Sequence, residues 1–338
     1  MSTLQVIWFM LVGVLFAGYA ILDGFDLGSG WWYLRDKKDK HRKAVLNAIG
    51  PVWDGNEVWL ITGGGALFAA FPAVYASVFS GMYLALILVL FGLILRATSI
   101  EFRNQLESPQ WRNVWDWAFG VGSLLPALLF GVALGNVVYG MELNANGDYT
   151  GSFFGLLNPY ALFGGVYGLV MFIVHGGLFL MIKSEGEMQE NIKRQFPLWW
   201  KIYLALFVLI GPMTAIFAGH MFKNFMQSPM LFLLPMLILG GIIMIFVFFR
   251  QEKYGKAFIA SAISIISILL TAGAMSFPVF VHAVDPAQSL TLFNSSSGSL
   301  TLTVMLIIAL IGMPFVLAYN IWVYKTFAGK VSGDEDMY

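Results

Sequence analysis

The long apolar runs of this chain, and the basic residues between them, constrain its fold more than any other sequence feature. Each run has about 20 residues or more, so as a helix rising about 1.5 Å per residue it is long enough to cross a hydrocarbon core of about 30 Å. We expect nine transmembrane helices, at residues 5–24, 51–70, 76–96, 114–138, 160–182, 200–222, 229–249, 257–281 and 300–324. The 338-residue chain is therefore predicted to be an all-α polytopic membrane protein with a single transmembrane domain.

The Lys and Arg residues identify the side on which each connection lies. Of the 19 Lys and Arg residues, 18 fall in connections on one side of the predicted helices or in the C-terminal tail, and Lys223 alone falls on the other side. Cytoplasmic connections carry the excess of Lys and Arg in membrane proteins. The N-terminus is therefore predicted to lie outside and the C-terminus inside.

Composition independently favours a membrane protein. The chain is 59% hydrophobic and 11% charged, whereas soluble domains are about 25% charged. It has no cysteine, which excludes thiolate metal sites, Fe–S clusters and disulfides. No basic region precedes the first apolar run, so we do not expect a cleaved signal peptide. The polar segments 140–159 and 282–299 are expected to be outer surface loops.

Five acidic residues lie within these apolar runs or at their ends, namely Asp23, Asp26, Asp54, Glu57 and Asp116. A carboxylate at the centre of a bilayer costs about 2.5–3.5 kcal/mol on translocon scales. Asp23 and Asp26 are three residues apart, as are Asp54 and Glu57, so each pair shares a helix face in the cytoplasmic half. Because neighbouring carboxylates repel, each pair is expected to hold a proton. The cluster is interpreted as the mouth of a cytoplasmic proton path, with Asp116 at a similar depth.

A second interpretation is that these acids cap helix ends or pair with Arg35, Arg96 or Arg103. It stays open for the three acids nearest the headgroups. Asp54 and Glu57 lie deeper and have no Lys or Arg within their own helix. For these two residues proton handling is the favoured interpretation.

His175 is the only histidine well inside a predicted helix. A histidine at such a depth can ligate haem iron or relay protons. A hydrogen-bonded packing role is commoner for a lone buried histidine, and we expect that role here. No metal-ligand set is therefore predicted in this chain.

The motifs around the acids resemble those of subunit II of the cytochrome bd quinol oxidases. The resemblance rests on residues 18–28 (GYAILDGFDLG), 53–60 (WDGNEVWL), 63–70 (GGGALFAA), 112–117 (RNVWDW), 149–151 (YTG) and 157–159 (LNP). These motifs lie within residues 12–165, and the number of helices and the length fit the family over the whole chain. The second half adds only topology.

The resemblance implies a fold and a complex. The fold would be two four-helix bundles, at about residues 1–140 and 158–282, plus one peripheral helix at 300–324. This chain would ligate no haem, and haem b and haem d would be held by subunit I, its partner in a heterodimer. The complex would be a terminal oxidase of the bacterial respiratory chain that oxidises quinol and reduces dioxygen to water. A small additional subunit is a further partner that the resemblance allows. The surroundings would be the lipid of the cytoplasmic membrane, with no nucleic-acid partner.

Residue roles follow by position within the matching motifs. Asp54 matches the family aspartate assigned to proton delivery towards the oxygen site, and Asp23 and Asp26 match acidic positions beside it. Trp59 matches a tryptophan linked in some members to an apolar route for oxygen. Glu57 departs from the pattern, because a familiar version of this motif has Gln there.

These roles give one main hypothesis and two competitors. In the main hypothesis Asp54 is the key proton relay, Glu57, Asp23 and Asp26 line the access path, and Asp116 supports it. The first competitor is a proton-coupled secondary transporter, although the acids gather at one membrane face rather than at the midplane. The second is a scaffolding subunit whose carboxylates pair with basic residues of a partner.

Overall fold

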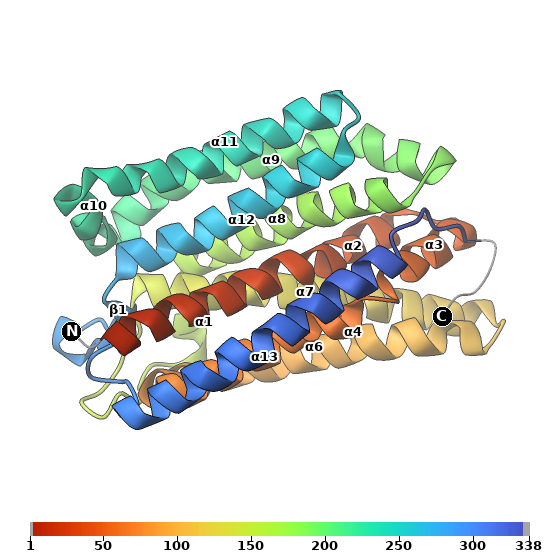
Figure 1. Ribbon diagram of the computed structural model, residues 1–338. Coiled ribbons are helices and arrows are strands. Elements are labelled where there is room, and N and C mark those ends of the chain that lie inside the picture. Colours follow the sequence, from red (N-terminus) through yellow and green to blue (C-terminus); the bar gives the residue numbers. More distant parts are fainter. Residues whose placement is uncertain (1–2, 334–338) are drawn as a thin grey trace.

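Long helices lie side by side along one axis in the computed structural model, which describes residues 3–333 (Figure 1). The α-helices are α1 Thr3–Leu22, α2 Gly24–Arg35, α3 Asp39–Ile49, α4 Trp53–Ala70, α5 Pro72–Gly81, α6 Tyr83–Phe102, α7 Pro109–Tyr139, α8 Pro159–Lys183, α9 Gly186–Phe217, α10 Lys223–Gln227, α11 Leu233–Arg250, α12 Tyr254–Ser276 and α13 Ser299–Thr326. Two short strands, β1 Val279–Val281 and β2 Leu290–Thr291, pair in an antiparallel manner. The predicted all-α membrane fold is confirmed.

Eight helical segments within residues 3–333 are long and apolar enough to cross a membrane. They correspond to eight of the nine predicted runs. The remaining run, residues 51–70, forms α4, whose first turns carry polar side chains that lower its hydropathy. At 18 residues α4 is about 27 Å long. That α4 is a ninth crossing therefore stays a prediction, as does the side that each terminus faces.

Four predicted runs had wrong boundaries. The run at 257–281 is longer than its helix, because α12 ends at Ser276 and residues 279–281 form β1. The first helix continues beyond residue 24, because α2 follows α1 almost without a break as far as Arg35. The run at 76–96 divides into the short helix α5 and the membrane segment Tyr83–Gln105. The run at 200–222 begins earlier, since α9 starts at Gly186. Apolarity marks the most hydrophobic stretch of a helix, and it misses polar turns that continue the same helix outside the hydrocarbon core.

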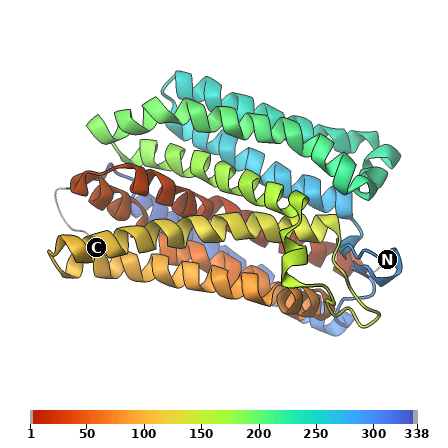
Figure 2. The same cartoon turned by 180° about the vertical axis from the view of Figure 1, so that it is seen from behind.

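The helices form two rows that share a core. Figure 2 shows α9, α8, α7 and α6 in sequence across the back, and each of them contacts the next. In the other row α4 contacts α1, α1 contacts α12, and α12 contacts α11, while α2 packs between α7 and α8. One hydrophobic cluster contains Phe25 and Phe119 from the first half and Phe172 and Ile265 from the second. The division into two four-helix bundles stays a prediction.

The helices differ sharply in how much of their surface is covered. In its most apolar stretch α8 has 83% of its residues buried, whereas α13 has 6%. The helix α8 is therefore the centre of the structure. The helix α13 lies across the front of the molecule in Figure 1, against α1 and α4. This placement fits the peripheral helix that the family resemblance implies at 300–324.

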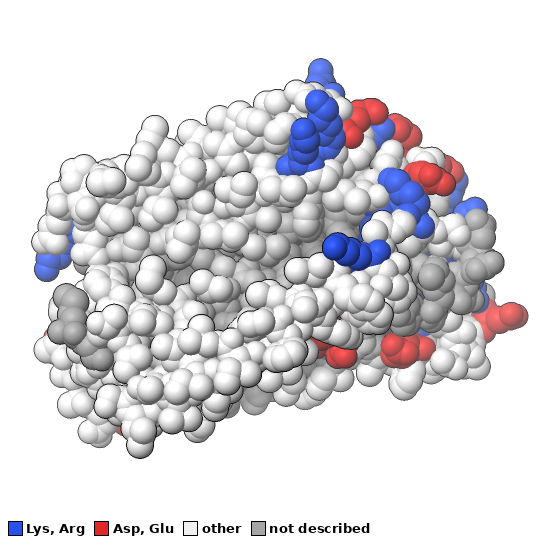
Figure 3. Space-filling model, viewed as in Figure 1, with Lys and Arg blue, Asp and Glu red and all other residues white. Residues whose placement is uncertain are grey.

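Charged side chains gather at one end of the molecule. In Figure 3 most of the blue and red atoms lie at the right-hand end, over the ends of α9, α11 and α12 and around α3. A broad uncharged band separates them from the few charges at the other end. We call the densely charged part the charged end. The helix α1 begins at the opposite end, and α13 ends at the charged end (Figure 1).

The two polar loops opposite the charged end pack on one another. The Met141 backbone N–H donates to the His282 carbonyl at 2.7 Å, and the Val284 N–H donates to the Met141 carbonyl at 3.0 Å. Val281, Leu290 and Leu292 are buried in a hydrophobic cluster with residues of α1 and α4. These loops therefore close the end of the helix bundle.

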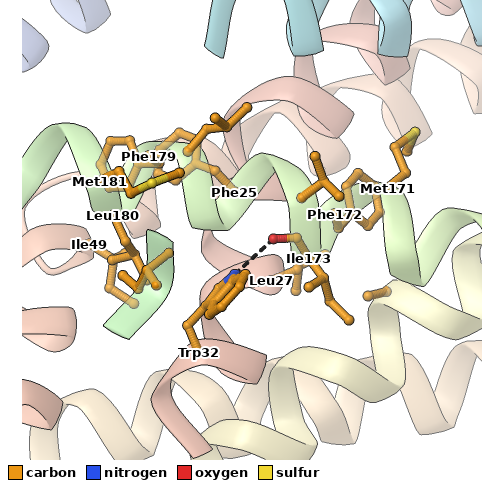
Figure 4. Packing of buried hydrophobic residues seen from close by; sticks show 14 of the residues in the cluster. Phe25, Leu27, Trp32, Ile49, Met171, Phe172, Ile173, Phe179, Leu180 and Met181 are labelled. Atoms are coloured by element: carbon orange, nitrogen blue, oxygen red, sulfur yellow. Dashed lines mark hydrogen bonds between the residues drawn. The ribbon is translucent and has the colours of Figure 1, made fainter. Parts of the chain in front are cut away.

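The closest helix contact in the core joins α2 to α8. The Trp32 indole N–H donates to the Ile173 carbonyl at 2.8 Å (Figure 4). A Cβ atom added to Gly28 would lie 1.7 Å from the Phe172 carbonyl oxygen, and one added to Gly176 would lie 2.6 Å from the backbone of α2. Small residues allow membrane helices to approach in this way. This contact fixes α2, with Asp26 and the preceding residue Asp23, against the central helix.

Replacing Gly28 by Ala is expected to destabilise the protein, because the new methyl group has to displace the backbone of α8. Overpacking of a tight core costs about 1–3 kcal/mol. The matched control is Gly13→Ala on α1, where an added Cβ meets nothing within 4 Å. Thermal unfolding of the purified membrane complex should show a lower Tm for G28A only. An equal Tm for both variants would contradict the tight contact.

Candidate proton-handling site

The junction of α1 and α2 places two carboxyl groups inside the protein. Asp23 lies between the two helices with a helical backbone, its N–H bonded to the Tyr19 carbonyl and its carbonyl to the Leu27 N–H, both at 2.9 Å. Asp23 and Asp26 have no exposed surface. Other helices therefore enclose both side chains, and their depth relative to the headgroups stays a prediction.

Arg96 is the cation of this site. It lies on α6 with no exposed surface. Its Nη2 donates to Asp23 Oδ1 at 2.7 Å and also to Glu57 Oε1. Among Asp23, Asp26 and Glu57, only Glu57 reaches the surface, with 21% of its side chain exposed. Three helices, α1/α2, α4 and α6, thus meet at a single guanidinium.

Asp26 forms a hydrogen bond to a different residue, on α4. Asn56 Nδ2 donates to Asp26 Oδ2 at 2.8 Å, and the Tyr324 hydroxyl donates to Asn56 Oδ1 at 2.8 Å. This chain of bonds joins α2 through α4 to α13. Sequence reasoning missed both Asn56 and Tyr324, although a polar amide between Asp54 and Glu57 was a signal that could have found the first. We call Asp23, Asp26, Asn56, Glu57, Arg96 and Tyr324 the Arg96 cluster.

Several polar atoms of this region have no hydrogen-bond partner within residues 3–333. They are the Tyr19 hydroxyl, Asp23 Oδ2, Asp26 Oδ1, and Arg96 Nε and Nη1. A buried polar group left without a partner costs about 1–3 kcal/mol. Water or a polar group of another subunit would therefore be stabilised at this place.

Asp54 lies outside the Arg96 cluster. Its side chain is on the exposed part of α4, whereas Glu57, three residues later, is partly buried against Arg96. The two acids are about one helical turn apart on α4, but only Glu57 contacts Arg96. Trp59 is buried, 7% exposed, and an added Cβ at Gly18 would lie 2.3 Å from its ring.

Asp116 belongs to a second cluster nearer the charged end. Arg103 Nε donates to Asp116 Oδ1 at 2.6 Å, and both Arg42 and the Tyr33 hydroxyl also donate to this carboxylate. Arg103 Nη2 donates to Asp39 Oδ1 at 2.6 Å. Asp116 is 3% exposed, but the Asp39 side chain is 46% exposed. The second cluster therefore connects a buried acid to the surface.

Both clusters contain a residue of α2 and an arginine of α6 or its 3-10 extension. Arg96 and Arg103 are seven residues apart on α6 and its 3-10 extension Arg103–Gln105, which is two turns or about 10 Å. Buried hydroxyl groups occupy the turns between them. Ser29 donates to the Phe25 carbonyl at 2.7 Å, and Ser99 donates to the Leu95 carbonyl at 2.5 Å.

His175 is a packing residue in this structure. Its Nδ1 lies 2.9 Å from Ser261 Oγ and its Nε2 lies 3.0 Å from the Ile21 carbonyl oxygen. The ring stacks on Phe258 with the centroids 4.3 Å apart. Both nitrogens are therefore engaged, as the packing interpretation predicted. Within residues 3–333 no group of three or more His, Asp or Glu side chains is placed to hold a metal ion.

Comparison with known proteins gives one consistent result. Residues 4–327 match the family model described as cytochrome bd terminal oxidase subunit II. The chain is 36% identical to cytochrome bd-I ubiquinol oxidase subunit 2 of Escherichia coli, covering 99% of this chain and 97% of that one. It is 34% identical to cytochrome bd ubiquinol oxidase subunit 2 of Bacillus subtilis, covering 100% and 99%.

A further relative and a solved structure agree with this result. The chain is 38% identical to a probable cytochrome oxidase subunit 2 of Haemophilus influenzae, covering 98% of this chain and 96% of that one. Its fold matches a chain of the bd oxidase from Geobacillus thermodenitrificans with a TM-score of 0.80, at 16% identity and with 96% and 98% covered. At that identity the structural match shows the fold alone.

Removing the central cation should destabilise the protein strongly. Arg96→Met leaves the Asp23 and Glu57 carboxylates without their partner, and breaking a buried ion pair in this way costs about 3–5 kcal/mol. Adding Asp23→Asn and Glu57→Gln to R96M should recover part of the loss, because the unpaired charges disappear. Arg194→Met, at an exposed position of α9, serves as the control. Urea unfolding of the purified complex measures the three variants against the wild type, and no recovery in the triple variant would contradict a charge-based site.

Asp39 should make stability depend on pH at the charged end. Burial raises the pKa of its carboxyl, but the hydrogen bond and charge of Arg103, with Arg112, outweigh it and lower the pKa below the usual 3.8. A lowered pKa stabilises the folded state above the unfolded-state pKa of about 3.8, and this stabilisation is lost as the pH falls through the folded value. The wild type should therefore exceed Asp39→Asn in Tm at pH 7 and approach it near pH 3. A Tm difference that stays constant over this range would contradict the ion pair.

Proposed function

Because the chain belongs to the cytochrome bd terminal oxidase subunit II family, we propose that within this oxidase it conducts protons towards the oxygen site of a partner. The chain is a multi-pass membrane protein and a subunit of a terminal quinol oxidase. What the family leaves open for this chain is how its own residues contribute. The Arg96 cluster is the observation that carries the proposal.

The partner in this proposal is the haem-bearing subunit I, in a bacterial cytoplasmic membrane. Haem b and haem d in that subunit supply electron transfer from quinol and the reduction of oxygen to water. The hydrogen bonds of both His175 nitrogens support a division of labour in which this chain ligates no haem. A small third subunit fits the same proposal.

The charge balance of the Arg96 cluster supports proton storage. Asp23, Asp26 and Glu57 provide three carboxyl groups, and Arg96 provides one guanidinium. Full ionisation of the three carboxyl groups would leave two excess negative charges in the membrane part of the protein. An unpaired carboxylate costs several kcal/mol there. The stable form of the cluster therefore holds protons on its carboxyl groups. A proton can leave one of these groups when a neighbouring group accepts it.

The second cluster supports access from the charged end. Asp39 is partly exposed and shares Arg103 with Asp116, and Arg103 lies about 10 Å along its helix from Arg96. The buried hydroxyls of Ser29 and Ser99 lie between the two levels on α2 and α6. In the proposal Asp116 helps protons enter from the surface. Water molecules connect the polar groups that are not in direct contact.

Asp54 fits the exit from this chain. It is exposed on α4 beside the Arg96 cluster, which would let it contact a polar group of the partner subunit. Glu57 lies one turn further along α4 and binds Arg96. A proton leaving the cluster would thus pass through Glu57 to Asp54 and into subunit I. Trp59, buried about one and a half turns beyond Asp54, stays our proposal for an apolar path for oxygen.

Replacing Asp54 by Asn should slow the oxidase while leaving it assembled. The amide keeps the size of the carboxyl group but cannot accept and release a proton. A positioned proton-transfer group contributes about 10²–10⁴-fold to rate, so we expect at least a tenfold loss of oxygen consumption. The control is Glu107→Gln, at an exposed position of the charged end. Quinol-driven oxygen uptake, normalised to the haem b and haem d absorbance, measures the effect.

Further variants separate a relay from a structural role. Asp54→Glu restores a titratable group and should recover most of the turnover, and D54N should regain rate as the pH is lowered. Normal turnover with normal haem content in D54N would refute the relay. Loss of haem from D54N would instead indicate that Asp54 holds the complex together. Proton flux through liposomes that contain this chain alone would favour the transporter hypothesis.

A further inference from the structure

An apolar groove runs along the outer surface of α11 and α12, away from both clusters. It has a volume of about 410 Å³ and is lined by Met236, Gly240, Met244, Phe248, Ile259 and Ile263 among others. Lys256 is the one charged side chain of the lining, and it lies at the charged end of the groove. We propose that this groove binds one anionic phospholipid, with an acyl chain along α11 and α12 and the phosphate on Lys256.

The length of the groove suits an acyl chain of one leaflet. Met236 and Phe248 are twelve residues apart on α11, which is about 18 Å along the helix. Half of a hydrocarbon core of about 30 Å is about 15 Å. The groove begins beside the turn between α11 and α12, so it covers the leaflet at the charged end.

Two glycines shape the groove in different ways. An added Cβ at Gly241 would lie 3.0 Å from the Ala260 carbonyl oxygen, so this residue lets α12 approach and forms the floor. An added Cβ at Gly240 would meet nothing within 4 Å. Gly240 therefore keeps the groove open without being needed for the helix contact.

The charges at the head of the groove select an anion. Three basic residues lie in or beside the turn between α11 and α12: Arg250 ends α11, Lys253 precedes α12, and Lys256 is in the first turn of α12. Blue atoms gather at the upper edge of Figure 3, where this turn lies. The only acid of this turn is Glu252, and its Oε1 accepts from Lys193 Nζ at 3.1 Å. Within residues 3–333 neither Arg250 nor Lys256 forms a salt bridge with a carboxylate. Basic residues at the membrane surface attract anionic lipids by about 1 kcal/mol each.

Lipid binding to the purified oxidase tests the proposal. The complex is incubated with phosphatidylglycerol or with phosphatidylcholine, and native mass spectrometry counts the retained lipids. Phosphatidylglycerol should bind more tightly than phosphatidylcholine to the wild type. Lys256→Gln should weaken phosphatidylglycerol binding about fivefold, which corresponds to about 1 kcal/mol. The matched control is Lys37→Gln, an exposed lysine elsewhere at the charged end.

A second variant tests the acyl-chain path without disturbing the fold. Gly240→Leu fills the groove, and its side chain extends into open space, so assembly and oxidase turnover should be unchanged. Gly211→Leu on α9 is the control, because an added Cβ there also meets nothing within 4 Å. Phosphatidylglycerol with a photoreactive acyl chain should label residues 236–263 in the wild type and in G211L, and lose this label in G240L.

Several outcomes would overturn the lipid site. Equal binding of the two lipids, with K256Q unchanged, would show ordinary solvation by the membrane. Labelling that persists in G240L would show that the chain lies elsewhere. Labelling blocked in the intact complex by another subunit would show that a protein covers the groove. None of these outcomes bears on proton conduction, which the turnover of the Asp54 variants tests separately.

Discussion

A single buried guanidinium holds the first half of this protein together. Arg96 extends from α6 to Asp23 at the α1/α2 junction and to Glu57 on α4, and it has no exposed surface. A charge at this depth is tolerated only when it is paired, so the three elements have to meet. A separate series of hydrogen bonds runs from Asp26 through Asn56 to Tyr324 on the otherwise exposed helix α13. In the proposed proton path, function and assembly therefore depend on the same atoms. A substitution here needs separate measurements of turnover and of haem content.

The second half of the protein provides a rigid support for this site. The central helix α8 packs against α2 so closely that Gly28 and Gly176 admit no side chain. Trp32 fixes the same contact through the Ile173 carbonyl. Asp26 of α2 and Asp23 just before this helix are thus held by an apolar interface with a helix that carries no acid. The surface of α11 and α12, on the far side of α8, is then free to interact with lipid.

The sequence predicted the acids but only part of their arrangement. The spacing of Asp23 and Asp26 correctly indicated a shared helix face, and the structure encloses both. Arg96 was considered only as a competing partner, because spacing along one helix says nothing about which residue a neighbouring helix presents. The same limit explains why the contact of Glu57 with Arg96 was not favoured, why the pairing of Asp116 with Arg103 was left open, and why the contact of Asp116 with Arg42 was not foreseen.

Apolar runs, the sidedness of Lys and Arg, and the local motifs are properties of short segments, and they determined the membrane class, most of the helices and the family. Segment properties suffice for this purpose because a bilayer requires each crossing to satisfy its own backbone hydrogen bonds. Tertiary structure decided the rest: which acids share Arg96, which carboxylate is left exposed, and where a groove opens between α11 and α12. Those outcomes depend on how helices far apart in the sequence rotate and pack, and no periodicity within one segment specifies that rotation.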